Sequence, residues 1–176
     1  TEGIGSYPNY YNSFITIVHP TMWNVRRGII LDVNRNSNER YRSEMFTIIG
    51  GAIYGEPNNY GEVGIKTGLV DFITIIGTLV AFMNESYHIG WNATGEEWIT
   101  MFAPKADTVT NGLLIEDGYV DVYGLDFIAV TNDPIVIYYN ARNKVNIRSK
   151  SPIMMKLARN PNNTEFVSLK YKELIQ

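Results

Sequence analysis

The chain of 176 residues contains no cysteine, which excludes disulfide bonds, thiolate nucleophiles and zinc sites built on cysteine. Charged residues make up only 19% of the chain, below the roughly 25% of an ordinary soluble domain. The formal net charge is −3, so the chain lacks the basic excess that drives sequence-independent binding to nucleic acid. We therefore expect no nucleic-acid partner.

The chain also lacks a long uninterrupted hydrophobic run. The longest apolar stretch, Leu69 to Phe82, contains Asp71 and Gly77. It is shorter than the roughly 20 residues that a helix needs to cross a bilayer. We therefore interpret this stretch as buried protein core and expect no membrane span.

Motifs of the common catalytic classes are missing as well. The sequence has no P-loop, no G-x-G-x-x-G and no G-x-S-x-G. No motif therefore indicates nucleotide-dependent chemistry or the nucleophile elbow of a hydrolase. Its two histidines, His19 and His88, are far apart in sequence and neither has the spacing of a metal ligand. Glu116, Asp117, Asp121 and Asp126 lack the spacing of an EF-hand calcium loop. We expect no enzyme, no cofactor and no metal.

Short β-branched and aromatic segments, separated by Asn, Gly and Pro, dominate what is present. Segments of this length and spacing are typical of strands in a sandwich or barrel. The expected strands cover residues 13–18, 28–33, 42–54, 62–66, 69–82 with a bend at Gly77, 97–103, 112–116, 119–123, 125–130, 135–139, 144–149, 153–158 and 165–171. Asp117-Gly118 and the cluster Gly55 to Gly61 predict hairpin turns. The predicted fold is all-β and mainly antiparallel, a β-sandwich or jelly-roll-like barrel with little helix.

The first twelve residues differ from the rest of the chain. Gly3, Gly5 and Pro8 interrupt any regular period there, so we expect residues 1–12 to form an extended N-terminal arm. The arm offers four apolar side chains for contact with a neighbouring subunit, Ile4, Tyr7, Tyr10 and Tyr11. Residues 13–176 are expected to form a single β-rich domain. A change in composition near residues 104–110 indicates an alternative, a domain boundary at that position.

Aromatic residues near the middle of the chain are the candidate binding residues. Trp91, Trp98 and Tyr87 lie close together in sequence and predict a stacking platform for a glycan. Glu96 and Glu97 stand beside them as the best carboxylate pair. Strand alternation places the two carboxylates on opposite faces, which disfavours glycoside hydrolysis by this pair.

A structural role is the leading functional hypothesis. Asn111 to Arg159, with short turns and the Gly-Leu-Asp-Phe step at 124–127, resembles in style the accessory or tail-associated β modules of virions. This resemblance carries no diagnostic motif and transfers no functional residue. We expect a non-enzymatic structural protein of a virion (capsid, decoration or tail) or a surface filament, acting through subunit contacts as a homo-oligomer at the virion or extracellular surface. The alternatives are a carbohydrate- or cell-surface-binding β-sandwich module and, third, a hydrolase that uses Glu97.

Overall fold

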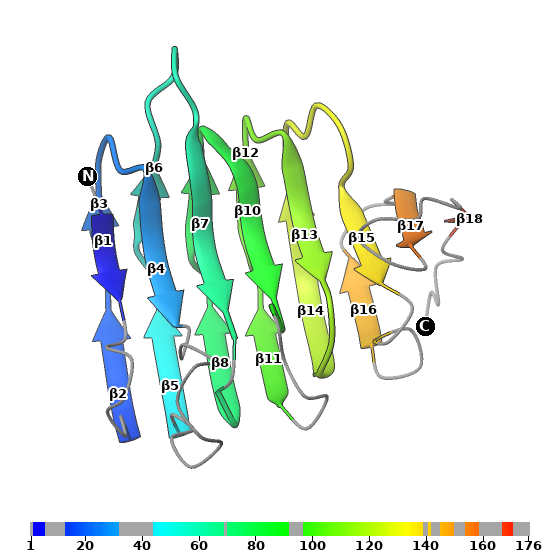
Figure 1. Ribbon diagram of the computed structural model, residues 1–176, viewed down its shortest axis with the longest axis horizontal. Helices are drawn as coiled ribbons and strands as arrows, with labels where there is room; N and C mark the ends of the chain where they lie inside the picture. Colours follow the sequence, from blue (N-terminus) through cyan, green and yellow to red (C-terminus); the bar gives the residue numbers. More distant parts are fainter. Residues whose placement is uncertain are drawn as a thin grey trace.

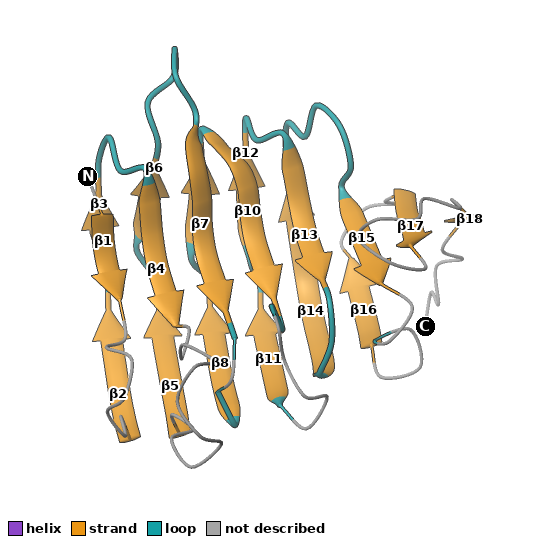
Figure 2. Ribbon diagram, in the orientation of Figure 1, coloured by secondary structure: helices purple, strands orange, loops and turns teal. Residues whose placement is uncertain are grey.

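The computed structural model of the chain describes residues 2–5, 13–31, 44–68, 70–91, 97–138, 141, 145–149, 154–158 and 167–170. All regular structure in these ranges is β-strand, and none of it is helix (Figure 2). Accordingly, the described ranges contain no helix that is long and apolar enough to span a membrane.

The strands form three sheets that run side by side along the long axis of the molecule (Figure 1). Sheet A contains β1 (Glu2–Gly5), β4 (Arg27–Leu31), β7 (Gly61–Thr67), β10 (Met83–Ile89), β13 (Asn111–Ile115), β15 (Ile135–Tyr138), β17 (Met154–Ala158) and β18 (Val167–Lys170). Sheet B contains β2 (Ser13–Val18), β5 (Glu44–Ile49), β8 (Phe72–Ile76), β11 (Trp98–Phe102), β14 (Tyr119–Phe127) and β16 (Val145–Ser149). Sheet C contains β3 (Thr21–Met22), β6 (Ala52–Tyr54), β9 (Leu79–Ala81) and β12 (Lys105–Asp107), and the long strand β14 joins it to sheet B.

The path of the chain is that of a parallel solenoid. It passes through sheet A, then B, then C, and returns to sheet A one strand further along the axis (Figure 1). Every strand pair in the described ranges is parallel except β17 with β18. The mainly antiparallel sandwich or jelly roll predicted from the sequence is therefore wrong, although the expectation of an all-β fold with little helix agrees with the structure.

Rows of apolar side chains fill the interior, one residue from each turn of the solenoid. In sheet A the buried row is Ile29, Ile65, Tyr87, Leu113 and Ile135. In sheet B it is Ile48, Ile75, Met101, Val122 and Ile147. Each side chain thus packs against its equivalents in the turns above and below, which is why β-branched residues recur at these positions.

The corner between sheets B and C has the same backbone conformation in each of five turns. Positive φ angles of 49°, 62°, 63°, 46° and 68° occur at His19, Gly50, Gly77, Ala103 and Gly124. The backbone ladder continues through the corners, with the N–H of Gly77 donating to the carbonyl of Phe102 at 2.8 Å. A Cβ on Gly77 would meet no atom within 4 Å, so only the backbone angle favours glycine there.

Sheets A and C approach each other closely where small residues of sheet A face inward. A Cβ on Gly64 would lie 2.3 Å from Cγ1 of Val80 and 2.8 Å from the carbonyl oxygen of Ser86. A Cβ on Gly28, in the neighbouring strand, would lie 2.7 Å from Cγ2 of Ile53. Glycine is therefore needed here because the two layers leave no room for a side chain.

Many expected strands are present, but the expected hairpins are not. The stretch Leu69 to Phe82 consists of two strands, β8 and β9, with the predicted bend at Gly77. Asp117-Gly118 does form a turn, yet it connects β13 of sheet A to β14 of sheet B. Likewise, residues 55–60 connect β6 of sheet C to β7 of sheet A. Both hairpin predictions are wrong because the strands on either side of each turn belong to different sheets.

Four segments with no predicted strand are part of the sheets, namely β1, β3, β10 and β12. Strand β10 lies between β7 and β13 in sheet A. Strand β12 occupies sheet C between β9 and β14, within the residues 104–110 that had indicated a boundary. At the N-terminus, Glu2–Gly5 forms β1 and pairs with β4, while residues 6–12 of the expected arm lie outside the described residues.

Candidate functional site

Three rows of side chains run along the outer face of sheet B, parallel to the solenoid axis. The first row is Phe72, Trp98 and Tyr119, and the exposed residues Met45 on β5 and Phe14 on β2 extend it. The middle row is Thr16, Thr47, Thr74, Thr100, Asp121 and Asn146. The third row is Val18, Ile49, Ile76, Phe102, Tyr123 and Arg148. We call these three rows the apolar face, because bulky apolar residues flank a line of small hydroxyl groups.

The apolar face holds most of the large hydrophobic side chains that the described residues expose. Eight of the eleven lie on it: Phe14, Val18, Met45, Phe72, Ile76, Trp98, Phe102 and Tyr119. Phe72 and Trp98 are each 53% exposed although they lie in the middle of the sheet. Single exposed apolar residues are common on proteins, but a continuous array of this kind is typical of an interaction surface.

The aromatic rings on this face stack on one another. Trp98 and Tyr119 lie with ring centroids 4.7 Å apart and planes 19° from parallel. Phe102 and Tyr123 lie 5.3 Å apart at 14°. Stacking therefore covers one face of each of these four rings.

A second surface of a different kind lies on the outer face of sheet A. A hollow of about 500 Å³ opens there over β4, β7 and β10. Its charged and polar lining consists of Arg27, Glu62, Lys66, Asn84 and Glu85. Its apolar lining consists of Ile30, Val63 and Trp91. We call this the polar hollow.

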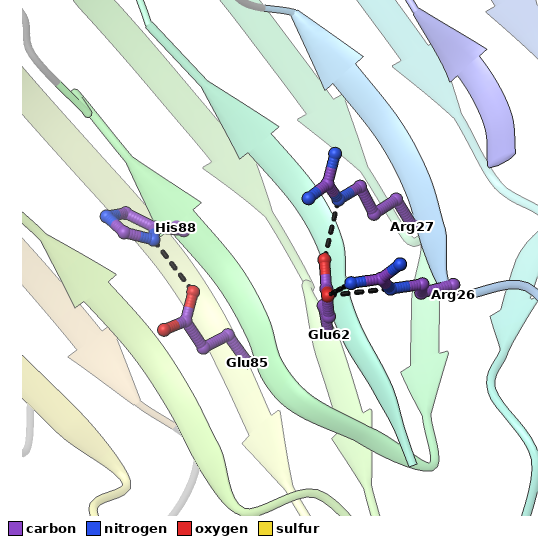
Figure 3. Close-up of polar contacts among 5 residues, drawn as sticks. All are labelled: Arg26, Arg27, Glu62, Glu85 and His88. Atoms are coloured by element: carbon purple, nitrogen blue, oxygen red, sulfur yellow. Dashed lines mark hydrogen bonds and ion pairs between the residues drawn. The ribbon is translucent and has the colours of Figure 1, made fainter. Parts of the chain in front are cut away.

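Ion pairs fix the position of Glu62 on one side of the polar hollow (Figure 3). Nε of Arg27 donates to Oε2 of Glu62 at 2.6 Å, and the Arg26 guanidinium donates to Oε1. The hydrogen bonds from Arg27 and Arg26 lower the pKa of the Glu62 carboxyl below its usual value. Glu62 is therefore ionised at neutral pH.

On the other side of the hollow, His88 connects two carboxylates. Its Nδ1 lies 2.8 Å from Oε2 of Glu85, as Figure 3 shows, and its Nε2 lies 2.8 Å from Oε1 of Glu116. Burial alone would lower the pKa of His88, but hydrogen bonds to Glu116 and Glu85 and their charges raise it above the ordinary value of 6.5. The hydrogen bond from His88 holds the Glu85 carboxylate in place at the edge of the hollow.

Lys66 and Trp91 complete the lining of the hollow. Nζ of Lys66 lies 3.3 Å from the centroid of the Trp91 ring, which is a cation–π contact. Trp91 follows the last strand residue of β10 by two positions, and its N–H donates to the carbonyl of Thr67 at 2.8 Å. The backbone N–H of Trp91 thus connects the residue after β10 to the end of the neighbouring strand β7.

The structure separates the three residues of the predicted stacking platform. Trp98 lies on the apolar face, Trp91 lines the polar hollow of sheet A, and Tyr87 is fully buried between the sheets. The Tyr87 hydroxyl donates to the carbonyl of Thr78 at 2.5 Å, and burial raises its pKa. Tyr87 therefore cannot stack on a ligand, and the two tryptophans belong to different surfaces.

The remaining candidates also have defined places. Glu97 is fully buried, so the carboxylate of the hydrolase hypothesis cannot reach a substrate, and Glu96 lies outside the described residues. Ile4 is 40% exposed on β1 at the end of sheet A. Tyr7, Tyr10 and Tyr11 lie outside the described residues. Within the described ranges, no group of three or more His, Asp or Glu residues could hold a metal ion.

Sequence reasoning missed both surfaces, although a signal for the apolar face was present. Residues 72–76, 98–102 and 119–123 read Phe-Ile-Thr-Ile-Ile, Trp-Ile-Thr-Met-Phe and Tyr-Val-Asp-Val-Tyr. Each begins with an aromatic residue, has a small polar residue in the middle and ends with an apolar or aromatic residue. Repetition of one five-residue pattern on successive strands indicates stacking in register. Glu85 and His88 had no such signal.

Comparisons with protein-family models, with curated proteins and with solved structures gave no match.

Proposed function

We propose that the chain is a non-enzymatic structural protein, a component of a virion or of a surface filament, and that it assembles by packing the apolar face against further copies of itself. The observation that supports this proposal is the run of exposed aromatic and aliphatic side chains over five adjacent parallel strands, β2, β5, β8, β11 and β14. Burial of such side chains is the main favourable term in most protein association.

The size of the apolar face supports assembly. Five strands spaced about 4.8 Å apart, each contributing five residues at about 3.3 Å, give a footprint of roughly 400 Å². An area of that size lies within the roughly 300–600 Å² of the largest apolar patch on a typical monomer, and such patches are often functional. Association that buries this face against another copy removes these side chains from water.

The chemistry of the face fits a second copy better than a glycan. Trp98 stacks on Tyr119 and Phe102 stacks on Tyr123, so each of these rings has one face covered by its neighbour and unavailable to a sugar. Few charges lie on the face, and Asp121 already accepts a hydrogen bond from Asn146 at 2.9 Å. Two copies can therefore meet across it with little desolvation of charge and little repulsion between like charges.

The oligomeric state in solution tests this proposal. We expect the full chain to be oligomeric at micromolar concentration by light scattering coupled to size-exclusion chromatography. The double variant Phe72→Lys, Trp98→Lys should shift it to monomer, because both positions are half exposed and two added charges per copy would face each other across the interface.

Trp23→Lys is the matched control, since Trp23 is 65% exposed but follows β3 rather than lying on the apolar face. This variant should keep the oligomeric state of the unmodified protein. A compact monomer for the unmodified chain, or an oligomer that the double variant leaves intact, would contradict the proposal.

A further inference from the structure

We propose that the polar hollow on sheet A is a binding site for a neutral, hydroxyl-rich saccharide. Its volume of about 500 Å³ lies within the roughly 300–1,000 Å³ of typical small-molecule sites. The hollow lies on a different sheet from the apolar face, so this site remains open when sheet B is covered. The inference is independent of the assembly proposal.

The charges that line the hollow select for a neutral ligand. Two cations, Arg27 and Lys66, and two carboxylates, Glu62 and Glu85, contribute to its wall, so their formal charges cancel. Because attraction and repulsion offset each other, the hollow has no net electrostatic attraction for an anion or for a cation. A hydroxyl group suits both kinds of neighbour, because it donates to a carboxylate and accepts from a cation.

The lining also offers an apolar surface beside the polar groups. Trp91, Ile30 and Val63 line the same hollow as Glu62, Glu85 and Asn84. Sugars present C–H groups on one side of the ring and hydroxyl groups around its rim. An indole next to carboxylate and amide groups matches that division, as in sites where a few polar groups orient a ligand against apolar walls.

The polar groups of the hollow are held in place without a ligand. Glu62 is fixed by Arg26 and Arg27, and Glu85 is fixed by His88 (Figure 3). These residues project from β4, β7 and β10 or from the residue before β4, all within a continuous parallel sheet. A site built on paired strands loses little conformational entropy on binding, which favours measurable affinity for a small ligand.

The test uses the full chain and a panel of neutral oligosaccharides of glucose, mannose, galactose and N-acetylglucosamine, with a uronic acid oligomer, a polyamine and free amino acids as charged and zwitterionic probes. Saturation-transfer NMR identifies binders, and calorimetry measures their Kd. We expect at least one neutral oligosaccharide to bind, and we expect the charged and zwitterionic probes not to compete with it.

Two variants locate the site. Trp91→Ala should raise Kd by about tenfold or more, corresponding to about 1.4 kcal/mol. Asn84→Tyr, at an exposed strand position that tolerates an aromatic residue, fills the hollow and should abolish binding without loss of the fold. Trp98→Ala, on the apolar face, is the matched control and should change Kd less than twofold.

The inference would be overturned if no neutral oligosaccharide binds, or if a charged or zwitterionic probe is preferred. It would also be overturned if binding depends on Trp98 rather than on Trp91 and Asn84. None of these outcomes bears on the oligomeric state, so the saccharide site and the assembly proposal can fail separately.

Discussion

Individual residues at the corner between sheets B and C show how the fold constrains the sequence. Five successive turns use the same left-handed backbone, three of them with glycine and two with His19 and Ala103. A residue with a Cβ is strained there by roughly 1–2 kcal/mol. The corner is nevertheless retained, because its backbone hydrogen bonds to the next turn continue the ladder on both sides.

Gly77→Val should lower the free energy of unfolding by about 2 kcal/mol, measured by denaturant titration. The cause is the backbone angle alone, since a Cβ at this position meets no neighbour within 4 Å. Ala103→Gly is the reciprocal control, because it relieves the same strain one turn further along and should not destabilise the protein. A neutral effect of the valine would mean that the corner can adopt another conformation.

His88 should make the stability of the protein depend on pH. Its pKa in the folded state is raised above 6.5 by Glu116 and Glu85, which outweigh the opposing effect of burial. A raised pKa means that the folded state holds the proton more tightly, so this stabilisation is fully present below pH 6.5 and is lost as the pH rises through the folded-state pKa.

Denaturant titrations across this pH range should therefore show stability falling as pH increases, and His88→Gln should flatten that decline. The imidazole resonances of His88, followed by NMR, should titrate at a pH above 6.5. A variant with the same pH slope as the unmodified protein would show that other groups cause the dependence.

At the scale of strands, the sequence predicted positions much better than partners. Alternation of buried and exposed residues is the same in a parallel solenoid as in an antiparallel sandwich, so β2, β8, β9 and β11 were recognisable. Direction was not. A turn such as Asp117-Gly118 supplies the positive φ that a hairpin needs, but a corner between sheets needs it equally.

The structural repeat of the solenoid could not be recognised in the sequence because its turns differ in length. Paired core residues are separated by 36 positions from Ile29 to Ile65 but by only 22 from Ile65 to Tyr87. Strand β10 was missed because its residues do not alternate: Ser86 and Tyr87, adjacent in sequence, are both buried. Because Glu85 and His88 lie on that strand, the polar hollow was missed with it.

Neighbouring isoleucines on β8 give a direct test of the strand register. Ile75 is fully buried and Ile76 is 37% exposed on the apolar face. Ile75→Ala should lower the free energy of unfolding by about 3 kcal/mol or more, and Ile76→Ala by about 1 kcal/mol or less. Both changes are best measured by denaturation of the Phe72→Lys, Trp98→Lys variant, so that association does not contribute. If both substitutions lower the free energy of unfolding equally, the assignment of Ile75 to the buried face of β8 and of Ile76 to its exposed face is wrong.

For the whole molecule, the solenoid makes stability a sum of contacts between adjacent turns. Each strand in the middle of sheet A has a partner on both sides, whereas β1 pairs only with β4 among the described strands. In repeat architectures of this kind, the free energy of opening depends on the neighbours that a turn has. The terminal turn is therefore expected to open more readily than the middle of the stack.

Hydrogen exchange, read by mass spectrometry, measures this gradient. Amides of β7 and β10 should exchange more slowly than amides of β1, since β7 and β10 are hydrogen-bonded on both sides and β1 pairs with β4 alone among the described strands. Comparison within sheet A avoids the protection that assembly through sheet B would add. If β1 exchanges as slowly as β10, the solenoid opens as one cooperative unit, or another copy of the chain covers its first turn. Repeating the measurement on the monomeric Phe72→Lys, Trp98→Lys variant separates these two explanations, because only the second predicts that β1 loses its protection when the subunits come apart.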